Sequence, residues 1–212
     1  MKDLFVLARK VQEFLDARSW RSCVIGGIAV QRWGEPRLTR DVDVALLTGF
    51  GGEESFVDAI LQQFNSRVPR GREFALEHRV MLLAAEDGTG IDLALGGLPF
   101  EENTISRASW FEFFPGLALR TCSAEDLIVM KAFAGRELDW ADIKGVIARH
   151  GVGLDWRMIL SELQPLCELK EAPEIVSRLE SLRKQLEGKY RSHLSREPRQ
   201  YPTHPEPAPG TT

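Results

Sequence analysis

The 212-residue chain is poor in cysteine and has no long apolar run. Its three cysteines, Cys23, Cys122 and Cys167, lie far apart, which argues against a disulfide framework and a CxxC zinc site. The longest apolar runs are about five residues, far short of the roughly twenty that span a bilayer. The first residues, with an acid at position 3, do not follow the pattern of a secretory signal. We therefore expect a cytoplasmic globular protein without a membrane segment.

No single sign of charge dominates the sequence. The formal net charge is -4 and the pI is about 5.7, which does not predict a general nucleic-acid binder. The local distribution is uneven: sixteen acidic and eight basic residues lie between Met81 and Ser177, but seven basic and four acidic residues follow from Arg178. A polyanion is therefore expected to bind near selected arginines only.

Hydrophobic periodicity predicts an α+β fold, in which a mixed sheet with flanking helices is followed by a helical C-terminal half. We expect an αβ domain over residues 1–121, a helical region over 122–193 and a disordered, proline-rich tail over 194–212. Helices are predicted over 3–18, 53–64, 123–134, 139–149, 156–166 and 173–190, with Pro165 marking an end or a kink. Strands are predicted over 22–25, 41–47, 73–77, 79–85 and 90–95, with a hairpin or a strand and loop over 109–120.

The central feature is a glycine pair followed by carboxylates. Gly26 and Gly27 interrupt a strand and precede a short helix, where backbone N–H groups can approach a phosphate closely. Asp41 and Asp43 share one face of the next strand, and a neighbouring strand could bring Asp92 beside them. Three carboxylates on one face repel each other unless a cation is present, and oxygen ligands suit Mg²⁺. Together these features predict a phosphoryl-transfer site.

Taken separately, each part has a plain structural explanation. A glycine pair is most often a turn, and two aspartates two residues apart are most often on a solvated strand edge. The sequence alone does not bring Asp92 to the pair.

The segment GGIAVQRWGEPRLTRDVDVAL resembles the signature of the DNA polymerase β-like nucleotidyltransferase superfamily. RLTRDVDV, together with SAEDLIVMKAFAGRELDWADI further on, resembles the narrower AbiEii/AbiGii-type group, many of whose members are toxins of toxin-antitoxin pairs. The resemblance spans about residues 22–147 and implies a nucleotidyltransferase-like fold. It also implies a transferase that uses NTP and Mg²⁺.

This resemblance implies a role for each matching residue. Gly26 and Gly27 would hold the triphosphate, Asp41 and Asp43 would bind Mg²⁺, and Asp92 would activate the acceptor hydroxyl and share a metal. Lys131 would reach the triphosphate, and Asp139 would bind or orient the nucleotide. Arg37 and Thr39, which precede the two aspartates, are further candidates for contact with phosphate. Gly27 replaces the serine of many superfamily members, so a serine contact to phosphate is absent.

The later residues keep structural alternatives. Lys131 could be a solvated residue of an amphipathic helix, and Arg136 and Asp139 could form a surface ion pair. Arg37 and Thr39 could belong to a plain polar turn.

Three functions fit the sequence. The first is transfer of NMP to an RNA hydroxyl, in particular a tRNA 3' end, by a toxin with a cognate antitoxin. In that case arginines and lysines would track the RNA phosphates: Arg67, Arg70, Arg72, Arg178, Arg183, Lys184, Lys189 and Arg191. The second is transfer to a cationic small molecule of the aminoglycoside kind, which the acidic middle of the chain would attract. The third is a non-catalytic module that binds a nucleotide or a partner protein.

Overall fold

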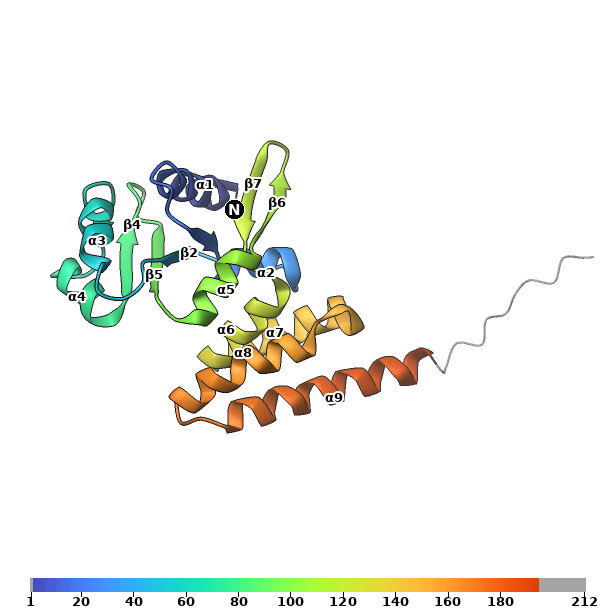
Figure 1. Ribbon diagram of the computed structural model, residues 1–212. Helices are drawn as coiled ribbons and strands as arrows, with labels where there is room; N and C mark the ends of the chain where they lie inside the picture. The colour runs from blue at the N-terminus through green and yellow to red at the C-terminus, as the bar shows by residue number, and fades with distance from the viewer. Residues whose placement is uncertain (1, 195–212) are drawn as a thin grey trace, which may run out of the picture.

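A computed structural model describes residues 2–194, without the side chains of residues 152 and 188–194. Its strands form one mixed sheet, and helices cover the sheet and continue after it (Figure 1), which confirms the α+β fold. The strands are β1 Ser22–Val24, β2 Asp41–Leu47, β3 Asn65–Ser66, β4 Val80–Ala84, β5 Gly90–Gly96, β6 Ser109–Phe114 and β7 Leu117–Thr121. The helices are α1 Lys2–Asp16, α2 Gly26–Trp33, α3 Glu53–Leu61, α4 Gly71–His78, α5 Pro99–Arg107, α6 Ala124–Ala134, α7 Glu137–His150, α8 Trp156–Leu169 and α9 Glu174–Leu194.

The order of the strands in the sheet is β3-β4-β5-β2-β1-β7-β6. β2 pairs in parallel with β5 and antiparallel with β1. The end of β1 therefore meets the beginnings of β2 and β5 at one edge of the sheet. That edge carries the glycine turn and all three aspartates.

Alternation along β2 and β5 separates an apolar face from a polar one. Val42 and Val44 of β2 are buried, as are Ile91 and Leu93 of β5, and they pack against α1, α3 and α4. Because successive side chains of a strand point to opposite faces, the aspartates project to the other side. This separation of the two faces confirms the alternation predicted from the sequence.

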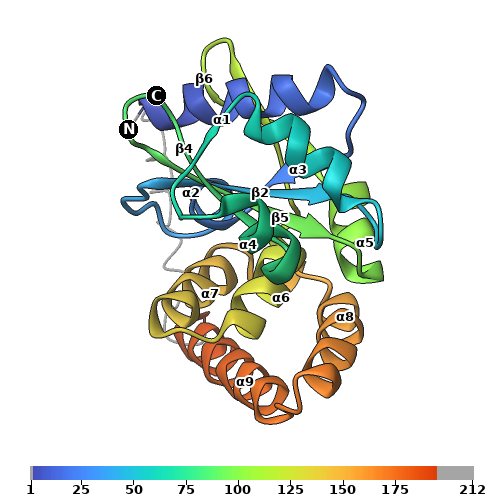
Figure 2. The ribbon, with the colours of Figure 1, turned by 90° about the vertical axis from the view of Figure 1, so that its left-hand side faces the viewer.

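The second face of the sheet is covered by α2, α5 and the C-terminal helices. Figure 2 shows the sheet between α1 and α3 on one side and α6 to α9 on the other. A second apolar cluster joins Ala29 and Val30 of α2 to buried residues of all four C-terminal helices, including Ile128, Ile143, Ile159 and Leu179. The C-terminal end of α7 is also held to α2, because Arg149 Nη1 donates to the carbonyl oxygen of Gly34 at 3.0 Å.

Most predicted elements are present, and one predicted strand was wrong. Residues 73–77 are helical within α4, not extended. Of the two alternatives predicted at Pro165, an end or a kink, the end is excluded, because α8 continues to Leu169. Helix α5 was not predicted at all. The strand pair β6 and β7 confirms the hairpin, and the side chain of Ser123 accepts a hydrogen bond from the Asp126 N–H, as expected of an N-cap.

Among the helices of residues 2–194, none is long and apolar enough to cross a bilayer. The division into domains at residue 121 stays a prediction. The predicted tail, apart from Leu194 at the end of α9, lies outside the described residues.

Candidate functional site

The glycine turn is built directly against strand β2. The Ile25 N–H donates to the Asp43 carbonyl oxygen at 2.9 Å, and the Gly27 N–H donates to Asp43 Oδ2 at 3.2 Å. Gly26 has a φ of +58°, and a methyl group in its place would overlap the Asp43 carboxylate. Only glycine therefore lets the start of α2 lie this close to a carboxylate.

Thr39 lies on the other side of the same turn. A methyl group on Gly27 would overlap the Thr39 hydroxyl oxygen, so this glycine makes room for the threonine side chain. Both glycines, Thr39 and Asp43 are thus neighbours around the first turn of α2. The backbone dipole of that turn favours negative charge.

The three aspartates lie on one face of two paired strands. Asp43 is in register with Asp92, and Asp41 is in register with Gly90. Burial raises the pKa of Asp43; the Gly27 N–H and Lys131 oppose this, while the negative charges of Asp92 and Asp41 add to it. Burial also raises the pKa of Asp92, against the effect of the Arg67 guanidinium. Burial, and after it the repulsion between the aspartates, therefore disfavours the charged forms of Asp43 and Asp92.

Arg67 reaches this face from the edge of the sheet. Its Nη2 forms an ion pair with Asp92 Oδ1, and its Nη1 lies 4.0 Å from Asp41 Oδ1. The sequence-based interpretation placed Arg67 on a surface that contacts RNA. Its guanidinium instead lies between Asp41 and Asp92, two of the predicted metal ligands. These residues are far apart in the sequence, which gave no signal for the contact.

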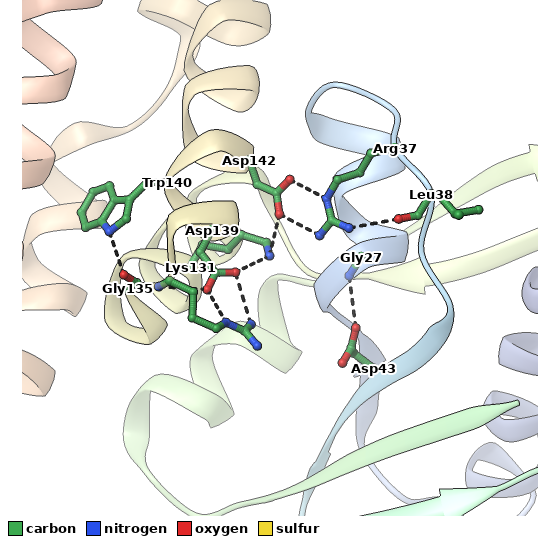
Figure 3. A network of polar contacts seen from close by, with 10 residues as sticks. Gly27, Arg37, Leu38, Asp43, Lys131, Gly135, Asp139, Trp140 and Asp142 are labelled. Atoms are coloured by element: carbon green, nitrogen blue, oxygen red, sulfur yellow. Dashed lines mark hydrogen bonds and ion pairs between the residues drawn. The ribbon is translucent and has the colours of Figure 1, made fainter.

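Five charged side chains, one from the loop before β2 and four from the helical half, form a cluster near the Gly27–Asp43 contact (Figure 3). Lys131 Nζ lies 2.8 Å from Asp139 Oδ1 and 2.8 Å from Asp142 Oδ2. Arg37 donates to both oxygens of Asp142, from Nε at 2.7 Å and from Nη2 at 2.9 Å. Arg136 Nε donates to Asp139 Oδ2 at 2.6 Å. The loop before β2 is thereby tied to α6 and α7.

The cluster holds its two acids ionised. Burial alone would raise the pKa of Asp139 and Asp142, but hydrogen bonds from their basic partners outweigh it and lower both values. With three basic and two acidic groups the cluster is net positive. The positive charge of Lys131 also opposes the burial that raises the pKa of Asp43.

The structure thus brings most predicted site residues together, but not all with the expected contacts. The Lys131 side chain is only 8% exposed, so it is not the solvated helix residue that the sequence allowed. The Arg136–Asp139 ion pair forms, but it is not a simple surface pair, because Arg136 is exposed and Asp139 is buried. Sequence reasoning missed the Arg37–Asp142 contact, which depends on how α7 packs against the loop.

The donor set of the carboxylate face suits a hard cation. Asp41, Asp43 and Asp92 offer only carboxylate oxygens, which Mg²⁺ prefers, and Arg67 already supplies one positive charge between two of them. Among the described side chains, those of residues 2–151 and 153–187, no group of three or more His, Cys, Asp or Glu is preassembled to hold a metal. The chemistry of the ligands therefore fits Mg²⁺, while Arg67 occupies part of the space between them.

The remaining basic residues of the predicted RNA surface are largely paired with acids. Arg72 contacts Glu54 and Asp58, and Arg70 lies 3.6 Å from Glu73. Two further pairs lie on the C-terminal helices, Arg178–Glu137 and Arg183–Glu187. The side chains of Lys189 and Arg191 lie outside the described part of the chain.

No protein-family model matches the chain, and no curated protein matches it. An antigenic nucleotidyltransferase-like protein from Paracoccidioides brasiliensis is similar in structure at 19% identity, with 84% of this chain and 91% of that chain covered and a TM-score of 0.47. The antibiotic-resistance factor ANT(2'')-Ia is similar at 17% identity, with coverages of 92% and 96% and a TM-score of 0.43. The lincosamide antibiotic adenylyltransferase LnuA is similar at 15% identity, with coverages of 65% and 92% and a TM-score of 0.42.

Proposed function

We propose that the chain is a nucleotidyltransferase, which transfers an NMP from an NTP to an acceptor hydroxyl. The observation that carries this proposal is the shared sheet edge, where the Gly26–Gly27 turn touches Asp43 and Asp43 is in register with Asp92. In this reaction the acceptor oxygen bonds to the α-phosphorus, pyrophosphate leaves, and the hydroxyl proton is released. The α2 turn supplies N–H groups for phosphate, and the carboxylates supply ligands and a proton acceptor.

Each residue has a defined part in this proposal. The backbone around Gly26 and Gly27 binds phosphate, and Asp92 accepts the proton of the acceptor hydroxyl. Asp41, Asp43 and Asp92 would hold Mg²⁺, which supplies positive charge to the triphosphate and the attacking oxygen. The net positive cluster of Lys131, Arg37 and Arg136 stabilises negative charge across the site. Its buried acids fix the positions of these three cations.

The finer proposal for the acceptor is an RNA end, particularly the 3' end of a tRNA, modified by a cytoplasmic toxin with a cognate antitoxin. It rests on the resemblance of residues 37–44 and 123–143 to AbiEii/AbiGii-type proteins. Its test is growth: expression should slow growth without the adjacent gene and not with it. RNA affinity should also fall strongly between low and physiological salt, since phosphate contacts release counterions.

A small cationic acceptor of the aminoglycoside kind is the second candidate. The ion pairs of Arg67, Arg70 and Arg72 favour it, because arginines already matched by acids offer a polyanion less. A resistance assay with a panel of aminoglycosides separates the two acceptors. Protection from an aminoglycoside without any labelling of RNA would select the small molecule.

The experiment that tests the activity is transfer of label from each of the four α-labelled NTPs, with Mg²⁺, to total RNA, protein and an aminoglycoside panel. The test variant is Asp43→Asn, which keeps the size and one oxygen of the side chain. The control is Asp58→Asn, which makes the same change in an exposed carboxylate that pairs with Arg72. We expect transfer by the wild type and the control, and its loss in Asp43→Asn with an unchanged circular dichroism spectrum.

Two outcomes would contradict the proposal. Equal transfer by Asp43→Asn and the wild type would remove the carboxylate from the chemistry. Nucleotide binding without transfer to any acceptor would instead identify a non-catalytic module.

A further inference from the structure

Arg67 is the one basic residue of the loop after β3 that points at the carboxylate face. Its own N–H donates to the Leu82 carbonyl oxygen at 2.8 Å, which continues the pairing of β3 with β4. Leu82 is in turn in register with Asp92. The backbone at Arg67 is therefore fixed one strand away from Asp92, within reach of an extended arginine side chain.

Strand β5 leaves room for the Arg67 guanidinium because residue 90 is glycine. Gly90 lies opposite Asp41 in the sheet, and a methyl group there would overlap Asp41 Oδ1 and lie 2.8 Å from Arg67 Nη1. The φ of Gly90 is not in the left-handed region, so backbone conformation does not require glycine. Glycine is required instead by the space that the Asp41 carboxylate and the Arg67 guanidinium occupy.

The charges around Arg67 explain why it stays there. Asp41 and Asp92 repel each other, and Arg67 places one positive charge between them. The neighbouring arginines lie elsewhere: Arg70 faces Glu73, and Arg72 faces Glu54 and Asp58. The guanidinium therefore does part of what a metal ion would do for these two carboxylates.

The geometry points to Arg67 as a built-in counter-cation of Asp41 and Asp92 that a divalent cation must displace, so that this arginine sets the metal affinity of the site. The inference rests on the proposed function for its metal and adds the residue that opposes its binding. The guanidinium and a divalent ion both need carboxylate oxygens of Asp41 on β2 and Asp92 on β5. Removing the arginine frees these oxygens, so it strengthens metal binding and weakens the metal-free fold.

The test is binding of Mn²⁺ alone to the full chain, followed by the electron paramagnetic resonance signal of the free ion. The variants are Arg67→Gln and, as a matched control, Arg70→Gln. The control removes the same charge three residues further along the chain, where the Arg70 side chain is 80% exposed. We expect Arg67→Gln to bind Mn²⁺ about three- to tenfold more tightly than the wild type, because the ion pair it loses is partly exposed. Arg70→Gln should bind as the wild type does.

Thermal unfolding gives a second measurement that does not involve activity. Without metal, Arg67→Gln should melt below the wild type, and Mg²⁺ should raise its melting temperature by more than that of the wild type. Arg67→Lys keeps the charge and provides a folded comparison if the glutamine variant does not fold.

The outcomes separate this inference from the proposed function. If Mn²⁺ binds all variants equally but not Asp43→Asn, the metal site stands and the role of Arg67 is wrong. If Mn²⁺ binds neither the wild type nor Arg67→Gln, both the inference and the metal-dependent function are overturned.

Discussion

Arg37 and Asp142 are joined by two hydrogen bonds, from Nε and Nη2 of the guanidinium to the two oxygens of the carboxylate. One residue belongs to the loop between α2 and β2, and the other to α7, 105 positions later in the sequence. The pair therefore fixes the loop that carries Thr39 into the glycine turn relative to the C-terminal helices. A bidentate pair of this kind sets orientation as well as distance.

Replacing Asp142 should destabilise the protein in a way that depends on pH. Hydrogen bonds from Arg37 and Lys131 outweigh burial and lower its pKa below the ordinary value of 3.8. A lowered pKa means that the carboxylate adds stability above 3.8 and loses it as the pH falls through the lowered value. Urea unfolding of Asp142→Asn at pH 7 should show a loss of about 2–4 kcal/mol, which shrinks toward pH 3. Glu13→Gln, in the exposed pair with Arg9, should lose under about 1 kcal/mol.

Lys131 should be needed for stability as well as for the nucleotide. Lys131→Met leaves the buried carboxylates of Asp139 and Asp142 with fewer partners, so the free energy of unfolding at pH 7 should fall by roughly 3–5 kcal/mol. Urea denaturation of Lys131→Met and of Lys144→Met, a change at an exposed position of α7, checks this. A variant as stable as the wild type would show that the lysine acts on the ligand alone.

The two functions of Gly26 can be separated by comparison with Gly88. Both have a positive φ, +58° and +84°, but only at Gly26 would a methyl group meet other atoms, those of Asp43. Gly88→Ala should lose about 1 kcal/mol from backbone strain alone. Gly26→Ala should lose more, and should also weaken NTP binding measured by calorimetry. If Gly26→Ala and Gly88→Ala had equal effects on stability and neither changed NTP binding, the Gly26 turn would have no part in binding phosphate.

The three cysteines should be unreactive in the native protein. All are buried, and burial raises the pKa of the Cys23 thiol to about 12 and that of Cys122 well above its ordinary value. Since the thiolate is the reactive form, an aromatic disulfide reagent at pH 8 should react at a rate set by unfolding. Modification of all three thiols within seconds in native buffer, as fast as in urea, would contradict their burial.

The sequence predicts the carboxylate face well because its signal is local. Asp41 and Asp43 alternate with Val42 and Val44, and this period of two defines the strand and its faces without knowledge of the rest of the fold. The prediction failed for residues 73–77, where the apolar run Phe74, Ala75 and Leu76 between two glutamates lies inside helix α4. Over five residues, a period of two and a helical period are difficult to distinguish.

The contacts made by the basic residues were out of reach for a different reason. Lys131 meets Asp139 and Asp142 because α6 and α7 fold back on each other, and Arg67 meets Asp92 across an intervening strand. Such pairings depend on tertiary packing, which spacing does not encode. Helix α5 did leave a sequence signal, Pro99 in its first turn followed by Glu101, that the interpretation did not use.

The residues that meet at the sheet edge are synthesised at different times. Asp43 and Asp92 emerge before Lys131 and Asp142, and β1 lacks its β7 partner until Thr121 has been made, since Val24 pairs with Thr121. N-terminal regions generally begin to fold first during synthesis. The three aspartates and Arg67 are therefore synthesised before Lys131 and Arg136, so Arg67 is available to pair with the acidic face before the cations of the C-terminal half.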